Sequence, residues 1–113
     1  MSSPTSRTLA TLRDEGWIVA VVEHFNHFAK IRQDLFGFAD IIAFNQDQVL
    51  LVQCTDGSSV SKRLDKIRAS DTAKAWAEAP SRRVEVWGWA QRGPKGKRKV
   101  WTARRVKLYA GRT

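Results

Sequence analysis

The sequence has little cysteine and proline and no long apolar run: its 113 residues include one cysteine and three prolines. Cys54 alone cannot form an internal disulfide and has no cysteine partner for a zinc site, which is typical of proteins in a reducing compartment. No segment approaches the roughly 20 apolar residues of a membrane span, and the first residues lack the apolar stretch of a signal peptide. We therefore expect a cytoplasmic protein without a membrane partner.

The length suits one domain, because 113 residues can bury a single core but not two cores of ordinary size. The apolar and turn patterns predict a helix at 3–15, strands at 17–25, 37–44 and 48–55, helical segments after the serines at 58–59 and over 70–80, and strands at 83–90 and 100–109. The strand over 17–25 has apolar residues on both faces, as in a strand covered on both sides. This order predicts an α/β domain with a central mixed sheet of about five strands flanked by helices.

Acidic residues are absent from the end of the chain. The net charge is +9, and residues 91–113 hold nine basic residues and no acidic one, whereas basic and acidic residues balance in the first 90 positions. A one-sided positive segment favours binding to a polyanion, most often a nucleic acid. A solvated tail is the alternative, although Trp101 and Tyr109 lie inside the segment. We expect residues 91–113 to form a basic loop and strand.

Two polar residues interrupt the apolar strands of a predicted hairpin. If residues 45–48 form a four-residue loop, Phe44 faces Val49 and Asp40 faces Gln53 across the two strands. Facing residues have Cβ atoms about 4.5 to 5.5 Å apart, close enough for both side chains to contact one cation. A shift of one residue would separate them.

A buried carboxylate needs compensation, because burial without a partner costs several kcal/mol or forces the carboxylate to take up a proton. A divalent metal such as Mg²⁺ or Mn²⁺ would accept oxygen ligands from Asp40, Gln53 and the backbone carbonyl of Cys54, with Asp34 as a third side-chain ligand. An ion pair with a nearby Lys or Arg, or a hydrogen bond between Asp40 and Gln53, explains the pattern equally well.

At these positions the sequence resembles the PD-(D/E)XK nuclease superfamily, and most closely its small Holliday-junction-resolvase-like members of phages and bacteria. In that superfamily an aspartate opens the first strand of a hairpin, and the next strand carries an acid or glutamine, any residue, then usually lysine. Asp40 in "GFADIIA" and Gln53 in "VQCT" match the first two roles. The resemblance covers residues 16–101 and implies a restriction-endonuclease-like core, so that residues 1–113 would form one nuclease-like domain.

The chain departs from the superfamily pattern at two places. Thr55 stands where the lysine is expected, and the first predicted helix begins "PTSR", without the glutamate that archaeal resolvases bring to the metal. Lys66 or Arg63, in the helix after the second hairpin strand, is the predicted replacement for the lysine. We expect the remaining basic residues to hold the nucleic-acid backbone: Lys62, Lys95, Lys97, Arg98, Lys99, Arg104, Arg105 and Lys107.

The resemblance implies a metal-dependent DNA endonuclease that selects branched or duplex DNA by its structure. A homodimer is expected, because cutting both strands of a junction needs two sites. The first alternative is a catalytically degenerate module on the same scaffold that binds DNA or RNA without cutting it, which Thr55 favours. The charge alone also allows a small ribosome-associated or RNA-processing protein.

Overall fold

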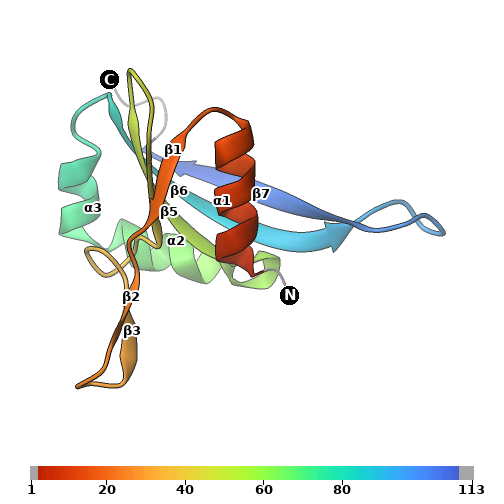
Figure 1. Ribbon diagram of the computed structural model, residues 1–113, viewed down its shortest axis with the longest axis horizontal. Coiled ribbons are helices and arrows are strands. Elements are labelled where there is room, and N and C mark those ends of the chain that lie inside the picture. Colours follow the sequence, from red (N-terminus) through yellow and green to blue (C-terminus); the bar gives the residue numbers. More distant parts are fainter. Residues whose placement is uncertain (1–2, 110–113) are drawn as a thin grey trace.

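Five strands build the central sheet in the computed structural model, which describes residues 3–109. Across the sheet the order is β1 (Ile18–Val21), β4 (Ile41–Phe44), β5 (Val49–Asp56), β6 (Arg82–Arg92) and β7 (Val100–Leu108) (Figure 1). Strands β5 and β6 run parallel, and the other neighbours are antiparallel. The predicted single α/β domain with a mixed five-stranded sheet is confirmed.

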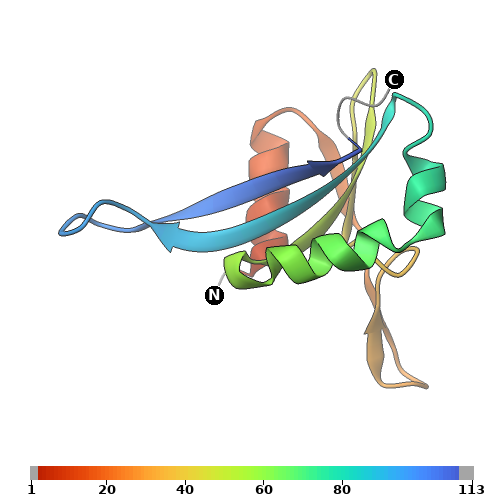
Figure 2. The ribbon, with the colours of Figure 1, turned by 180° about the vertical axis from the view of Figure 1, so that it is seen from behind.

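Helices cover both faces of this sheet. Helix α1 (Pro4–Asp14) lies on one face, while α2 (Val60–Arg68) and α3 (Asp71–Trp76) lie on the other and connect the parallel strands β5 and β6 (Figures 1 and 2). Each face buries its own apolar cluster. Leu12 of α1 packs with Trp87 and Trp89 on the first face, and Leu64 and Ile67 of α2 lie in the cluster on the second.

Local sequence explains where the helices begin. Ser3 and Ser6 form a capping box at the start of α1, and the side chain of Ser70 accepts a hydrogen bond from the backbone of Ala73 in α3. The serine predicted to cap α2 makes no such bond. The side chain of Asp56 instead caps the short 3-10 turn η1 (Gly57–Ser59) that precedes α2.

The β4–β5 hairpin has the predicted register. Phe44 pairs with Val49 and Ile42 with Leu51, with residues 45–48 forming the loop between them. The side-chain oxygen of Asn45 accepts hydrogen bonds of 2.9 Å from the backbone N–H groups of Asp47 and Gln48, which fixes this turn. The turn therefore places residue 40 opposite residue 53.

The single strand predicted for 17–25 is wrong. Strand β1 ends at Val21, and β2 (His24–Asn26) pairs with β3 (Ile31–Gln33) in a separate hairpin that projects from the body (Figure 1). Strand β1 is also an edge strand, with Ile18 60% exposed, so it is not covered on both faces. Apolar β-branched residues predict a strand, but they do not say where it bends or which strand it joins.

Three other boundaries differ from the prediction. Residues 37–40 precede β4 and contain a turn, helix α3 ends at Trp76, and β6 is longer than expected. The extended β6 and β7 form a long hairpin that leaves the body, which shortens the basic loop to residues 93–99 (Figures 1 and 2). Gly88 lets β6 pack closely against Val60 at the start of α2, because an added Cβ would lie 2.2 Å from Val60 Cγ2.

None of the helices within residues 3–109 combines the length and the apolar character needed to cross a bilayer.

Candidate metal centre

Asp40 and Gln53 form the buried polar pair that the hairpin register predicts. Asp40 immediately precedes β4, and Gln53 lies in β5; their exposed fractions are 4% and 3%. Gln53 Nε2 donates a hydrogen bond of 2.8 Å to Asp40 Oδ2, and the backbone N–H of Cys54 donates one of 2.7 Å to the same oxygen. The sequence-based alternative of a direct hydrogen bond between the two side chains is therefore present in the structure.

Two further carboxylates lie beside Asp40. Glu23, Asp34 and Asp40 each place a carboxylate oxygen within 4.8 Å of the oxygens of the other two. Glu23 stands just before β2 and Asp34 just after β3, so the β2–β3 hairpin leaves and rejoins the body at this cluster. Asp34, the predicted third side-chain ligand, therefore lies beside Asp40.

The sequence interpretation missed Glu23. The signal was an acidic residue after the apolar run "WIVAVV", the same kind of interruption that singled out Asp40. A single strand over 17–25, as the sequence predicts, would carry Glu23 away from Asp40. The bend after Val21 brings the two together instead.

The cluster changes the protonation of Asp40. Burial raises the pKa of Asp40 to about 8; the hydrogen bond from the Cys54 backbone opposes this rise, while Asp34 and Glu23 add to it. Three carboxylates at this separation repel one another strongly when all are charged and no cation is bound. In the absence of a cation, burial and the neighbouring carboxylates therefore favour the protonated form of Asp40.

Basic side chains partly neutralise the outer carboxylates. Arg32 Nη1 lies 3.0 Å from Glu23 Oε1, and Lys66 Nζ lies 4.0 Å from Asp34 Oδ2. Both basic side chains are substantially exposed, at 73% and 47%, so these ion pairs are weak and can open. The predicted replacement Lys66 therefore contacts the cluster through Asp34.

A depression of about 310 Å³ brings the cluster together with Arg63. Its lining comprises Asp40, Gln53, Cys54, Arg63, Asp34, Glu23, Arg32, Pro4 and Thr5. Two buried polar atoms here, Gln53 Oε1 and Arg63 Nε, have no hydrogen-bond partner among the residues that the structure describes. An unpartnered amide oxygen beside three carboxylates is an all-oxygen donor set that fits Mg²⁺ or Mn²⁺.

Cys54 and Thr55 contribute little charge to this depression. Burial raises the pKa of the Cys54 thiol to about 12, so this side chain is a small apolar group and not a nucleophile. Its backbone N–H contacts Asp40, and ligation by its backbone carbonyl stays a prediction. Thr55 is buried in β5 and pairs with Gly88, and it cannot supply the positive charge of the expected lysine.

Most of the predicted nucleic-acid ligands lie on the long β6–β7 hairpin, which we call the β6–β7 arm. Lys95, Lys97, Arg98 and Lys99 are exposed in the tip of the β6–β7 hairpin, Arg104 and Lys107 are exposed along β7, and Lys62 is exposed on α2. Arg105 differs from these residues, because it forms an ion pair with Glu15 and stacks 3.9 Å from the centre of the Trp87 ring.

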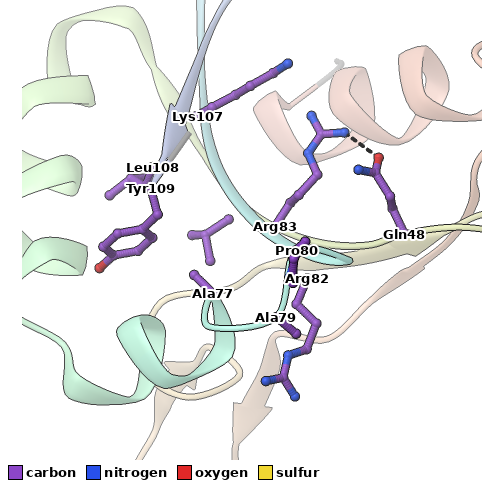
Figure 3. A pocket seen from close by; sticks show the side chains of 10 residues that line it. Gln48, Ala77, Ala79, Pro80, Arg82, Arg83, Lys107, Leu108 and Tyr109 are labelled. Atoms are coloured by element: carbon purple, nitrogen blue, oxygen red, sulfur yellow. Dashed lines mark hydrogen bonds between the residues drawn. The ribbon is translucent and has the colours of Figure 1, made fainter. Parts of the chain in front are cut away.

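A second depression, of about 280 Å³, lies where α3 leads into β6 (Figure 3). Its basic side chains Arg82, Arg83 and Lys107 point in different directions, and Arg83 donates a hydrogen bond of 2.8 Å to Gln48 (Figure 3). Because these cations do not converge, they do not form an anion site.

Trp87 and Trp89 are core residues on the face of the sheet that α1 covers. They are 1% and 8% exposed, and Trp89 Nε1 donates a hydrogen bond of 2.9 Å to Thr8 of α1. The indole of Trp87 likewise donates to the buried Glu85. Neither ring is available to stack on a base.

Comparisons with protein-family models, with curated proteins and with solved structures give no match.

Proposed function

We propose that this chain is a metal-dependent DNA endonuclease that hydrolyses phosphodiester bonds and selects branched DNA by its structure, as a Holliday junction resolvase or a repair nuclease does. One observation carries the proposal. Glu23, Asp34 and Asp40 converge within 4.8 Å of one another in a depression that also holds Gln53 and Arg63. The resemblance to the PD-(D/E)XK superfamily points the same way, since the strand, hairpin, helix and strand on which it rests are all present.

The residues would share the work as follows. Asp40, Asp34, Glu23 and Gln53 would hold Mg²⁺ or Mn²⁺, which, when bound, supplies an activated water and offsets the charge that develops on the phosphate. Arg63 would bind a phosphate oxygen. It would supply the positive charge of the superfamily's lysine, at whose position Thr55 stands. Lys66 would balance the charge of Asp34.

The β6–β7 arm would hold the DNA backbone outside the cleavage site. Its exposed lysines and arginines contact phosphates without reading bases, so they favour recognition by shape over recognition by sequence. A homodimer would present two such sites to the two strands of a junction.

A degenerate binding module on the same scaffold is the second candidate. Thr55 in place of lysine favours it, as do the two hydrogen bonds that Asp40 already accepts. The two candidates share the basic arm and differ in whether the carboxylate cluster supports cleavage.

Cleavage separates the two candidates. End-labelled four-way junction, flap, duplex and single-stranded DNA, and a single-stranded RNA, are incubated with Mg²⁺ or Mn²⁺ and the wild-type protein, Asp40→Asn or the matched control Asp47→Asn, which changes an exposed aspartate in the β4–β5 turn. We expect the wild type and the control to cut junction DNA, and Asp40→Asn to bind it without cutting. Binding without cleavage by all three proteins contradicts the nuclease and supports the binding module.

A further inference from the structure

The β2–β3 hairpin carries an apolar tip into solvent. It projects away from the sheet and the helices in both views (Figures 1 and 2). Residues 27–30, between the two strands, form its tip, and Phe28 there is 101% exposed. Phe25 and Ile31 on the flanking strands are about half exposed, at 49% and 51%. The hairpin therefore presents three large apolar side chains that the rest of the described chain does not cover.

Polar contacts hold this tip in a defined shape. Asn26 Oδ1 accepts hydrogen bonds of 3.0 Å from the backbone N–H groups of Phe28 and Ala29, and Asn26 Nδ2 bonds to Gln33 across the hairpin. The rings of Phe25 and His27 meet edge to face with centroids 5.1 Å apart. Because the turn is already formed, presenting Phe28 to a partner requires little further ordering.

The hairpin is anchored at the carboxylate cluster. Glu23 precedes β2 and Asp34 follows β3, so the base of the hairpin stands at the proposed cleavage site and its tip points away from it (Figure 1). Residues 24–33 include Lys30 and Arg32 and contain no acidic residue. The tip therefore carries one cation, Lys30, beside Phe28, while Arg32 on the flanking strand is paired with Glu23.

We infer that this hairpin is a wedge that inserts Phe28 between stacked bases of DNA at a branch point, with the phosphate to be cut held at the base of the hairpin. The inference rests on the proposed function, and it names the feature of the substrate that the site selects. Apolar side chains such as Phe and Leu unstack a base step when they enter it, and unstacking costs least where pairing is already interrupted. A branch point supplies such a step, whereas a continuous duplex does not.

Charge favours DNA over a second copy of this chain as the occupant. Two hairpins meeting tip to tip would bring Lys30 of one copy against Lys30 of the other. A nucleic acid offers flat base surfaces for Phe28 and phosphates for Lys30 at the same time. Dimerisation through the hairpin is tested as the competing outcome.

The test measures base unstacking under conditions in which no metal is present for cleavage. A four-way DNA junction and a linear duplex of the same sequence carry 2-aminopurine at the branch-point base, and protein is added to saturation in EDTA. We expect wild-type protein to raise 2-aminopurine fluorescence several-fold on the junction and much less on the duplex. Phe28→Ala should abolish the rise at saturation, and Phe28→Leu should restore most of it.

Phe44→Ala is the matched control, because Phe44 is 45% exposed at the opposite end of the molecule, beside the β4–β5 turn (Figure 1). It should behave as wild type. An equal rise with Phe28→Ala overturns the wedge, and so does a change from dimer to monomer in sedimentation with Phe28→Ala. Cleavage of the same junction in Mn²⁺ is measured in parallel. If the protein cuts but the fluorescence does not depend on Phe28, the wedge alone is refuted. If the fluorescence depends on Phe28 but the protein does not cut, only the nuclease is refuted.

Discussion

Gln53 donates a hydrogen bond of 2.8 Å from its amide nitrogen to Asp40, while its amide oxygen is buried without a partner among the described residues. A buried polar atom left unpaired costs about 1 to 3 kcal/mol. The pair is therefore only half satisfied, and a cation that accepts the free oxygen completes it. This asymmetry is what the proposed metal site predicts, whereas a purely structural hydrogen bond does not require it.

Replacing Gln53 by Met should separate metal binding from folding. Gln53→Met removes both the unpartnered oxygen and the hydrogen bond to Asp40, and these changes have opposite effects on stability, so we expect the metal-free variant to unfold at about the wild-type temperature. Wild-type protein should be stabilised by Mn²⁺, by about 2.7 kcal/mol at 100 times the dissociation constant, and the variant by much less. Thermal unfolding with and without Mn²⁺ measures both effects.

Gln91→Met is the control, because Gln91 is an exposed glutamine near the end of β6. It should keep the full Mn²⁺ response. An equal response in Gln53→Met would mean that Gln53 is not a ligand.

The protonation of Asp40 should make metal-free stability fall as pH rises. The pKa of Asp40 is about 8 in the folded protein, against an ordinary value of 3.8 for an aspartate in the unfolded chain, so between these values the folded state holds a proton that the unfolded state has lost. Stability from this group is complete below pH 4 and decreases through pH 8, by up to about 1.4 kcal/mol per pH unit.

Asp40→Asn cannot titrate and should lack this slope. Urea unfolding of both proteins in EDTA, from pH 5 to pH 8, gives the difference between them and cancels the other titrating groups. We expect the variant to gain stability relative to wild type at each step. Parallel curves would show that Asp40 is ionised throughout this range.

Arg63 should matter for cleavage more than for binding. Its guanidinium lines the depression with Asp40 and Gln53, so Arg63→Ala should lower the cleavage rate of junction DNA about 100-fold while the dissociation constant changes little. Arg63→Lys should recover part of the rate. Arg68 lies in the same helix, is exposed and pairs with Asp65, so the control variant Arg68→Ala should cut at the wild-type rate. If both alanine variants cut equally well, Arg63 has no part in the reaction.

The hairpin that positions Asp40 and Gln53 could be predicted because its cause is local. Continuous apolar runs specify the two strands, and the Asn45 turn sets the pairing that brings residues 40 and 53 together. The α/β order was predictable for the same reason. Each depends on spacing along a short stretch of chain.

The third carboxylate depended on a tertiary bend and could not be predicted in this way. Glu23 reaches Asp40 only because the chain leaves the sheet after Val21 and forms the projecting β2–β3 hairpin. Nothing in the composition of 17–25 separates a long strand from two short ones. The ion pair between Arg105 and Glu15, which are 90 positions apart, likewise could not be predicted from the number of basic residues in the segment.

Arg104 and Arg105 test which arginines of the arm bind DNA. They are neighbours in β7 with opposite surroundings: Arg104 is exposed opposite Gly88, whereas Arg105 pairs with Glu15 of the α1 end and stacks on Trp87. Arg105→Ala should therefore lower the free energy of unfolding by about 1 kcal/mol and leave the salt dependence of DNA binding unchanged. Arg104→Ala should leave stability unchanged and reduce the slope of log K against log salt by about 1, because one phosphate contact is lost. Urea unfolding and DNA titrations at several salt concentrations measure the two quantities, and the reverse pattern would place Arg105, and not Arg104, on the DNA.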